Sequence, residues 1–112
     1  LAVRARVALD AGVHPSRILL DPGIGFAKDS PASRALVEGA GAFRALGFEL
    51  LVGPSRKSFL DPSGLLAPAD RDAATFEAAL TCVRQGVAVL RLHHGREWDF
   101  IRKVARAREV FA

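Results

Sequence analysis

Short apolar runs alternate with longer amphipathic stretches along the 112 residues of this chain. The apolar runs cover residues 18–20, 50–53 and 87–92, and polar or turn-forming residues follow each of them. Short apolar runs with such ends are typical of buried strands, whereas apolar side chains at three- and four-residue spacing indicate helices. The alternation predicts right-handed βαβ units around a parallel sheet, and therefore an α/β fold.

The amphipathic stretches predict four helices, at about residues 2–11, 30–46, 71–85 and 96–111. Gly12, Gly47 and Gly86 stand where the first three helices are expected to end, because glycine readily adopts the left-handed conformation of a helix C-terminus. At the opposite ends, Ser30 is expected to cap the second helix and Asp70 the third.

Polar side chains follow all three predicted strands at the same end. They are Asp21 after the first strand, Arg56, Lys57 and Ser58 after the second, and Arg91 and His93 after the third. The carboxyl ends of parallel strands share one edge of a sheet, which is where α/β proteins bind their ligands. A carboxylate accepts from two adjacent N–H groups, and Lys and Arg suit phosphate or carboxylate oxygens. The pattern therefore predicts a site for an anionic ligand with a hydrogen-bonding ring.

Each of these residues also has a simpler interpretation. Asp21 precedes Pro22 and Gly23, and taken alone it is typical of a residue that begins a turn. The loop that follows has neither the Gly-Lys-Ser/Thr ending of a P-loop nor the Gly-x-Gly-x-x-Gly pattern of a dinucleotide site. His93 and His94 are too few ligands to indicate zinc. The indication of a site lies in the convergence at three strand ends.

Composition narrows the class of protein. Half of the residues are hydrophobic and a quarter are charged, as in an ordinary globular domain, and the net charge is +4. The arginines are spread along the chain, which favours a solvated surface over a nucleic-acid partner. No apolar run is long enough to predict a membrane span, and no stretch resembles a signal peptide. The single cysteine, Cys82, is expected in the core, and a cytoplasmic location is the default.

Three segments occur in a specific order: Asp-Pro-Gly-Ile-Gly-Phe-Ala-Lys at residues 21–28, Leu-Val-Gly-Pro-Ser-Arg-Lys-Ser-Phe at residues 51–59, and Leu-Arg-Leu-His at residues 90–93. Together they closely resemble the dihydropteroate synthase family, and Ser-Arg-Lys-Ser is their most specific part. The resemblance implies a (β/α)8 TIM barrel in which these are strands six to eight. Residues 1–112 would then be a single partial domain, the carboxyl-terminal segment of a longer protein. The absence of Met and the open edges of a three-stranded sheet favour the same interpretation.

The resemblance implies a reaction and a role for each rim residue. The family joins 6-hydroxymethyl-7,8-dihydropterin pyrophosphate to 4-aminobenzoate and releases pyrophosphate in folate biosynthesis. By resemblance, the residues expected at the pterin are Asp21, Gly53, Lys57 and Arg91, those at the pyrophosphate are Arg91 and His93, and those bordering 4-aminobenzoate are Phe26, Arg56 and Ser58. Lys57, Arg91 and His93 would serve catalysis by stabilising the leaving charge, and no protein nucleophile is required.

The resemblance also carries expectations about cofactor and assembly. Mg²⁺ is implied, with its main protein ligand outside this segment, so that no residue of 1–112 is expected to bind the metal. A homodimer is implied, and the isolated segment is expected to be inactive. Ala27 departs from the family, which usually has Gly there. Two alternatives remain open: a pterin-dependent methyltransferase domain, and a non-catalytic or accessory pterin-binding homologue.

Overall fold

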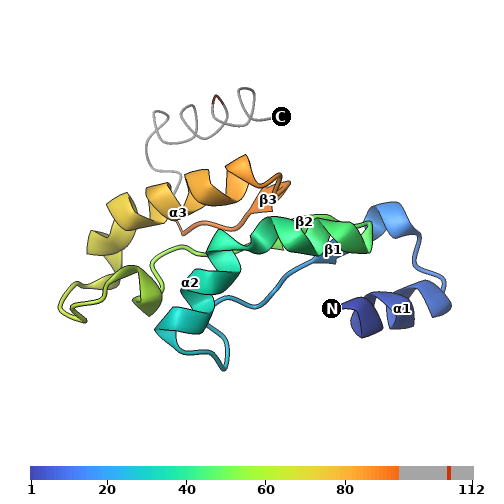
Figure 1. The fold of residues 1–112 in the computed structure, drawn as a ribbon, viewed down its shortest axis with the longest axis horizontal. Helices are drawn as coiled ribbons and strands as arrows, with labels where there is room; N and C mark the ends of the chain where they lie inside the picture. The colour runs from blue at the N-terminus through green and yellow to red at the C-terminus, as the bar shows by residue number, and fades with distance from the viewer. Residues whose placement is uncertain (94–105, 107–112) are drawn as a thin grey trace.

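Three short parallel strands form the centre of the computed structural model, which describes residues 1–93 and 106 (Figure 1). The strands are β1 (Leu19–Leu20), β2 (Glu49–Val52) and β3 (Val89–Leu90), in the order β1-β2-β3. Leu19 pairs with Glu49, and Leu51 pairs with Val89, both in parallel register. The predicted parallel sheet is confirmed, although two of its strands are shorter than the apolar runs that indicated them.

Three α-helices accompany the sheet within the described residues: α1 (Ala2–Asp10), α2 (Ser30–Glu38) and α3 (Asp72–Arg84). In Figure 1, α3 runs along one side of the strands, and α1 lies at the end of the molecule next to β1. Four 3₁₀ helices complete this part of the chain: η1 (Pro15–Arg17), η2 (Ala40–Leu46), η3 (Ser58–Leu60) and η4 (Pro68–Arg71). The predicted helix at residues 96–111 lies outside the described residues.

The predicted helix at residues 30–46 is two elements, because α2 ends at Glu38 and the chain continues after Gly39 as the 3₁₀ helix η2. Gly41 in η2 packs so closely against Gln85 that a side chain at this position would collide with it. Its N–H donates to Oε1 of Gln85 at 2.9 Å, and a Cβ at this position would come within 3.2 Å of the Gln85 carbonyl oxygen. The close approach of η2 to the end of α3 therefore outweighs the continuation of a regular α-helix.

The predicted helix caps are wrong by one residue at both N-termini. Asp29, not Ser30, caps α2, and its Oδ1 accepts from the backbone N–H of Ala32 at 2.8 Å. Ser30 is already the first helical residue. Asp70 belongs to η4, so that Arg71 takes the N-cap position of α3 without a side-chain hydrogen bond to the helix. The predicted stops at the C-termini are confirmed, since the three glycines there have positive φ.

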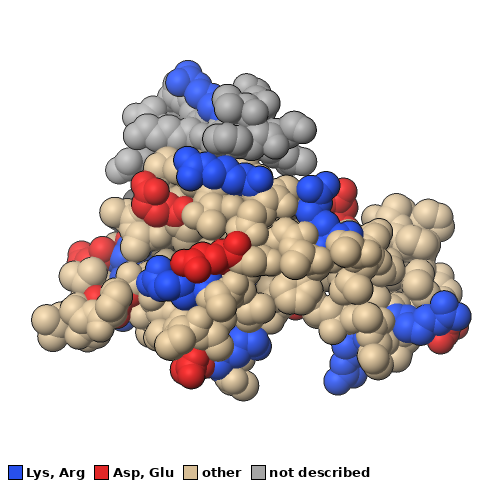
Figure 2. All heavy atoms as spheres, in the orientation of Figure 1, with Lys and Arg blue, Asp and Glu red and all other residues tan. Residues whose placement is uncertain are grey.

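A single apolar core lies between the strands and the helices. Its fully buried members include Leu50 and Val52 of β2 and Cys82 of α3. Cys82 is 0% exposed, which confirms the prediction that this cysteine is a core residue, and burial raises the pKa of its thiol to about 12. In Figure 2, acidic and basic side chains are scattered over the face shown. Within the described residues, no helix has the length and apolarity needed to cross a membrane.

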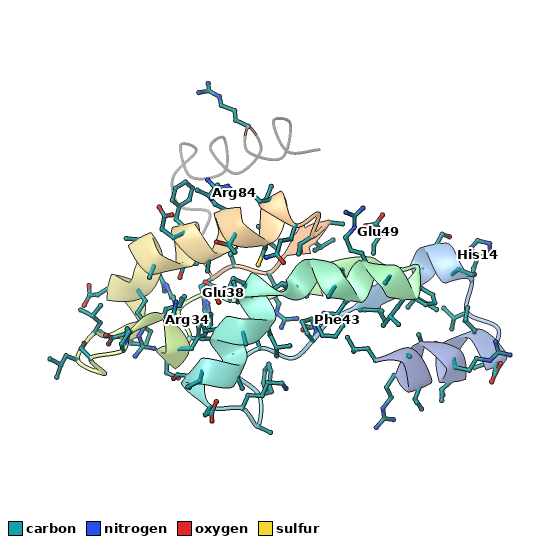
Figure 3. The ribbon with its side chains drawn as sticks, in the orientation of Figure 1. His14, Arg34, Glu38, Phe43, Glu49 and Arg84 are labelled. Atoms are coloured by element: carbon teal, nitrogen blue, oxygen red, sulfur yellow. The ribbon has the colours of Figure 1, made fainter. Side chains whose placement is uncertain are left out.

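Arg34 on α2, labelled in Figure 3, ties the helix to the segment that follows β2. Its Nη2 donates to the Phe59 carbonyl oxygen at 2.8 Å, and its guanidinium carbon lies 5.9 Å from the centroid of the Phe59 ring. Phe59 itself is buried in the core. These contacts fix η3, and with it the loop of residues 53–57 that leads from the sheet to η3.

Candidate functional site

A charged pair joins the carboxyl ends of the two outer strands. Asp21 directly follows β1 and Arg91 directly follows β3, and Nη2 of Arg91 lies 3.3 Å from Oδ2 of Asp21. The two residues are 70 positions apart in sequence. Because β2 lies between β1 and β3, the pair spans the end of the middle strand. The Asp21 side chain is 33% exposed and that of Arg91 is 56% exposed, so a ligand can reach both.

Gly53 lies beneath this pair, at the first position after β2. A Cβ there would come within 3.0 Å of Nη2 of Arg91 and 3.2 Å of its Nε. The backbone of Gly53 therefore supports the guanidinium directly, and any side chain would displace it. The Arg91 guanidinium thus packs against the Gly53 backbone, and the role of Gly53 as the floor of a ligand site stays a prediction.

Asp21 begins a turn, as its place before Pro22 and Gly23 predicted. Its Oδ1 accepts from the backbone N–H of Gly23 at 2.8 Å, which closes a turn, while Oδ2 faces Arg91. The loop continues through Ile24, which is 1% exposed, and Gly25, whose N–H donates to Oγ of Ser33 at 3.1 Å. The turn thus anchors the carboxylate to α2 and leaves its second oxygen at the strand end.

Lys57 reaches back over the same loop. Its Nζ donates to the carbonyl oxygen of Ile24 and lies 4.8 Å from the centroid of the Phe26 ring. Burial lowers the pKa of Lys57, and the positive charge of Arg91 lowers it further, while Asp21 opposes the shift. The predicted rim residues Asp21, Lys57 and Arg91 are therefore electrostatically coupled.

The Arg56 side chain contacts Asp72 of α3 and not the Asp21–Arg91 pair. Its Nε and Nη2 contact the two oxygens of Asp72 at 2.8 and 3.0 Å, and this hydrogen-bonded pair raises the pKa of Arg56. The backbone is held as well: the Arg56 N–H donates to Oγ1 of Thr75, and Nη1 of Arg71 donates to the Arg56 carbonyl. These contacts maintain Arg56 at φ +58°, and Ser58 follows as an exposed residue at the start of η3.

Sequence reasoning missed Ser55 and the residues of α3 that hold Arg56. Ser55 is 4% exposed, and its Oγ lies 3.0 Å from both the backbone nitrogen and Nδ1 of His93. It forms part of the Ser-Arg-Lys-Ser segment, which was the available signal. Asp72 and Thr75 gave no such signal, because their spacing from Arg56 becomes meaningful only once the loop and helix are packed together.

The described residues do not provide a metal site of their own. Among residues 1–93 and 106, no group of three or more His, Cys, Asp or Glu side chains is arranged to hold an ion. The Mg²⁺ implied by resemblance therefore does not fit these side chains alone.

The sequence model of the pterin binding enzymes matches residues 1–93. The chain belongs to the pterin-binding enzyme family. It is 40% identical over 99 residues to the dihydropteroate synthase of Synechocystis sp., a match that covers 86% of this chain and 34% of that protein. It is also 34% identical over 88 residues to the dihydropteroate synthase of Bacillus subtilis, covering 79% of this chain and 31% of that one. The chain thus spans about a third of these relatives.

Solved structures extend the similarity to three dimensions. The dihydropteroate synthase of Thermus thermophilus in complex with 4-aminobenzoate matches all of this pterin-binding family chain with a TM-score of 0.86 and 35% identity. The match covers 44% of the Thermus thermophilus chain. The same enzyme has also been solved in complex with 6HMPPP. The predicted fold, a segment of a TIM barrel with three parallel strands, is confirmed.

Proposed function

We propose that this protein is a dihydropteroate synthase, which joins 6-hydroxymethyl-7,8-dihydropterin pyrophosphate to 4-aminobenzoate and releases pyrophosphate. The observation that carries the proposal is the Asp21–Arg91 pair, 3.3 Å apart over Gly53, with Lys57 coupled to both charges. The similarity to dihydropteroate synthases supports it. Residues 1–112 contribute one part of the site.

The pterin is recognised by the carboxylate. Oδ1 of Asp21 accepts from the backbone of Gly23 and Oδ2 faces Arg91, and each oxygen keeps a further lone pair for a ligand N–H group. Oδ2 accepts from the amino-pyrimidine edge as Arg91 leaves it and flanks the ring, a planar cation against a planar π-system. Gly53 is the floor of this position, and Lys57 donates to the ring from the side of the Asp21 loop. The exchange is possible because both side chains of the pair are partly exposed: Asp21 gains a hydrogen-bonded ligand group, and Arg91 gains the face of the ring.

The chemistry is substitution at the pterin methylene carbon. The arylamine nitrogen forms a bond to that carbon as the bond to the pyrophosphate oxygen breaks, and the amine then loses a proton. Arg91 and His93 receive the leaving pyrophosphate at the end of β3, while Lys57 adds positive charge beside the ring. Fixed cations and N–H donors that face developing negative charge lower the barrier without any protein nucleophile. These three residues are the proposed catalytic residues.

The 4-aminobenzoate is proposed to lie between Phe26, Arg56 and Ser58. Phe26 is 62% exposed, which makes its ring face available for stacking. Arg56 borders this space from a fixed position, because Asp72 holds its guanidinium and Thr75 its backbone. The arrangement implies that Arg56 shapes the border of the position without moving.

The test is an assay of the full natural chain that carries residues 1–112, with both substrates and Mg²⁺. We expect dihydropteroate to form, and Asp21→Asn to weaken pterin binding by about tenfold to a hundredfold, the value of a charge-assisted hydrogen bond. Asp10→Asn is the matched control, because Asp10 pairs with Arg6 on the exposed surface of α1. Pterin binding without product would favour a non-catalytic homologue, and dependence on a corrinoid would favour a methyltransferase.

We also propose that residues 1–112 alone are inactive, and that the full protein is a cytoplasmic homodimer. The sheet of the described residues has two open edges, which a complete barrel would pair. Dihydropteroate formation by the purified segment would refute the first proposal. Light scattering of the full protein tests the dimer, and cell fractionation tests the location.

A further inference from the structure

We propose that Ser55 is a positioning residue that fixes the ring tautomer of His93, so that Nε2 carries the proton and donates to the leaving pyrophosphate. The inference rests on the proposed function for the identity of the anion. The tautomer of His93 is inferred only from its contacts with Ser55 in the structure. The sequence pattern gives Ser55 no role of its own, and Ser55 does not itself contact the reacting atoms.

The Ser55 hydroxyl makes two contacts with His93. Oγ of Ser55 lies 3.0 Å from the backbone nitrogen of His93 and 3.0 Å from Nδ1 of the same residue. The backbone N–H is a donor in every protonation state, so Oγ is the acceptor in that bond. The hydroxyl proton of Ser55 then remains to be placed.

The burial of Ser55 indicates which atom accepts the hydrogen bond from its hydroxyl group. Ser55 is 4% exposed, so water does not replace a missing partner, and a buried hydroxyl without an acceptor is unfavourable. Within residues 1–93 and 106, Nδ1 of His93 is the acceptor within hydrogen-bonding distance of Oγ. Ser55 therefore donates to Nδ1. In a neutral imidazole the proton must then reside on Nε2.

The consequence is a donor aimed away from the protein. His93 is exposed although its Nδ1 side is bound to a buried group, so the opposite nitrogen, Nε2, is the one open to a ligand. An Nε2–H group suits an anion oxygen, whereas the other tautomer would present a lone pair to the pyrophosphate. Ser55 thereby determines whether His93 presents an attractive N–H donor or a repulsive lone pair to the leaving pyrophosphate.

His14 provides a comparison within the same chain. It precedes η1, near the amino end of β1, and its Nδ1 lies 2.7 Å from Oγ of Ser16 (Figure 3). There the backbone N–H of Ser16 donates to Nδ1 directly, at 3.2 Å, so the tautomer does not depend on the hydroxyl. Ser16→Ala is therefore a matched control for Ser55→Ala: each removes a serine hydroxyl that contacts a histidine Nδ1.

The experiment is ¹⁵N NMR of the full natural chain labelled at histidine, recorded at a mildly alkaline pH. The signals are assigned with His93→Gln and His14→Gln. We expect an unprotonated Nδ1 and a protonated Nε2 at His93, and a shift toward a tautomer mixture in Ser55→Ala but not in Ser16→Ala. Titration with inorganic pyrophosphate is expected to show binding weakened roughly threefold to tenfold in Ser55→Ala, the loss of one net hydrogen bond.

A protonated Nδ1 at His93 in the wild-type protein would overturn the inference, and this measurement needs no variant to fold. Unchanged tautomer and unchanged pyrophosphate affinity in Ser55→Ala would overturn it as well. A wild-type protein with the expected tautomer that binds no pyrophosphate and forms no dihydropteroate would instead refute the proposed function. The two failures are therefore distinguishable.

Discussion

Gly25→Ala tests whether the position of Lys57 depends on the Asp21 loop. A Cβ at Gly25 would lie 2.8 Å from Cδ of Lys57, and apolar carbons pack at about 3.5 Å or more. The lysine stem must therefore move by roughly 0.7 Å, which disturbs the bond from Nζ to the Ile24 carbonyl and the approach to Phe26. We expect pterin affinity to fall on the order of tenfold, the lower end of the value of a charged hydrogen bond.

Stability must be separated from this effect, because Gly25 has φ +80°. An alanine in the left-handed region costs roughly 1–2 kcal/mol. Gly47→Ala is the matched control, since Gly47 has φ +87° and a Cβ there would meet no atom of the described residues within 4 Å. Urea unfolding should show similar losses for both variants, and calorimetric titration with a dihydropterin analogue should show a loss only for Gly25→Ala. Equal pterin affinity in the two variants would refute the steric argument.

Three further predictions concern the helix cap, the core thiol and the rim lysine. Asp29→Ala is expected to destabilise the protein by about 1 kcal/mol in urea unfolding, because it removes the cap of α2, whereas Ser30→Ala is expected to change little; the reverse order would restore Ser30 as the cap. Cys82 is expected to resist iodoacetamide at pH values well below its pKa of about 12 and to react after unfolding in urea, and rapid alkylation of the folded protein would contradict its burial. Since the pKa of Lys57 is lowered below 10.5, the unfolded state binds more protons in the interval just under that value, and stability should rise there with pH. Lys57→Gln is expected to lack this rise in paired denaturation series, and an identical pH profile would contradict it.

The strands and their common edge could be predicted because both depend on local pattern. An apolar run that ends in polar residues positions a strand terminus within a residue or two, and parallel pairing then brings Asp21 and Arg91 together across 70 positions. The residues of the two outer strand ends meet because only one strand separates them. This meeting of the outer strand ends depends on the order and direction of the strands, which the sequence pattern predicts, and not on the orientation of individual side chains.

Element boundaries failed where two local solutions were close in free energy. Asp29 and Ser30 are both good caps and adjacent, and the fixed φ of Pro31 suits the first turn with either of them. The break at Gly39 depends on Gln85, a contact 44 positions away from Gly41. Orientation of side chains was also beyond the pattern: Arg56 and Lys57 are neighbours, yet one faces Asp72 and the other faces the Asp21 loop.

The excess of positive charge around Lys57 favours a negatively charged ligand at the rim. The positive charges of Arg91 and Lys28 lower the pKa of Lys57, and the carboxylate of Asp21 opposes this shift. Three cations to one carboxylate leave a local excess of positive charge, which burial of the lysine stem makes less favourable. An anion placed between Arg91 and Lys57 would relieve this repulsion and restore the pKa of Lys57 toward its ordinary value. On the proposed function, a pyrophosphate-bearing ligand is therefore expected to relieve the repulsion among the rim cations on binding, and a neutral ligand of the same shape is not.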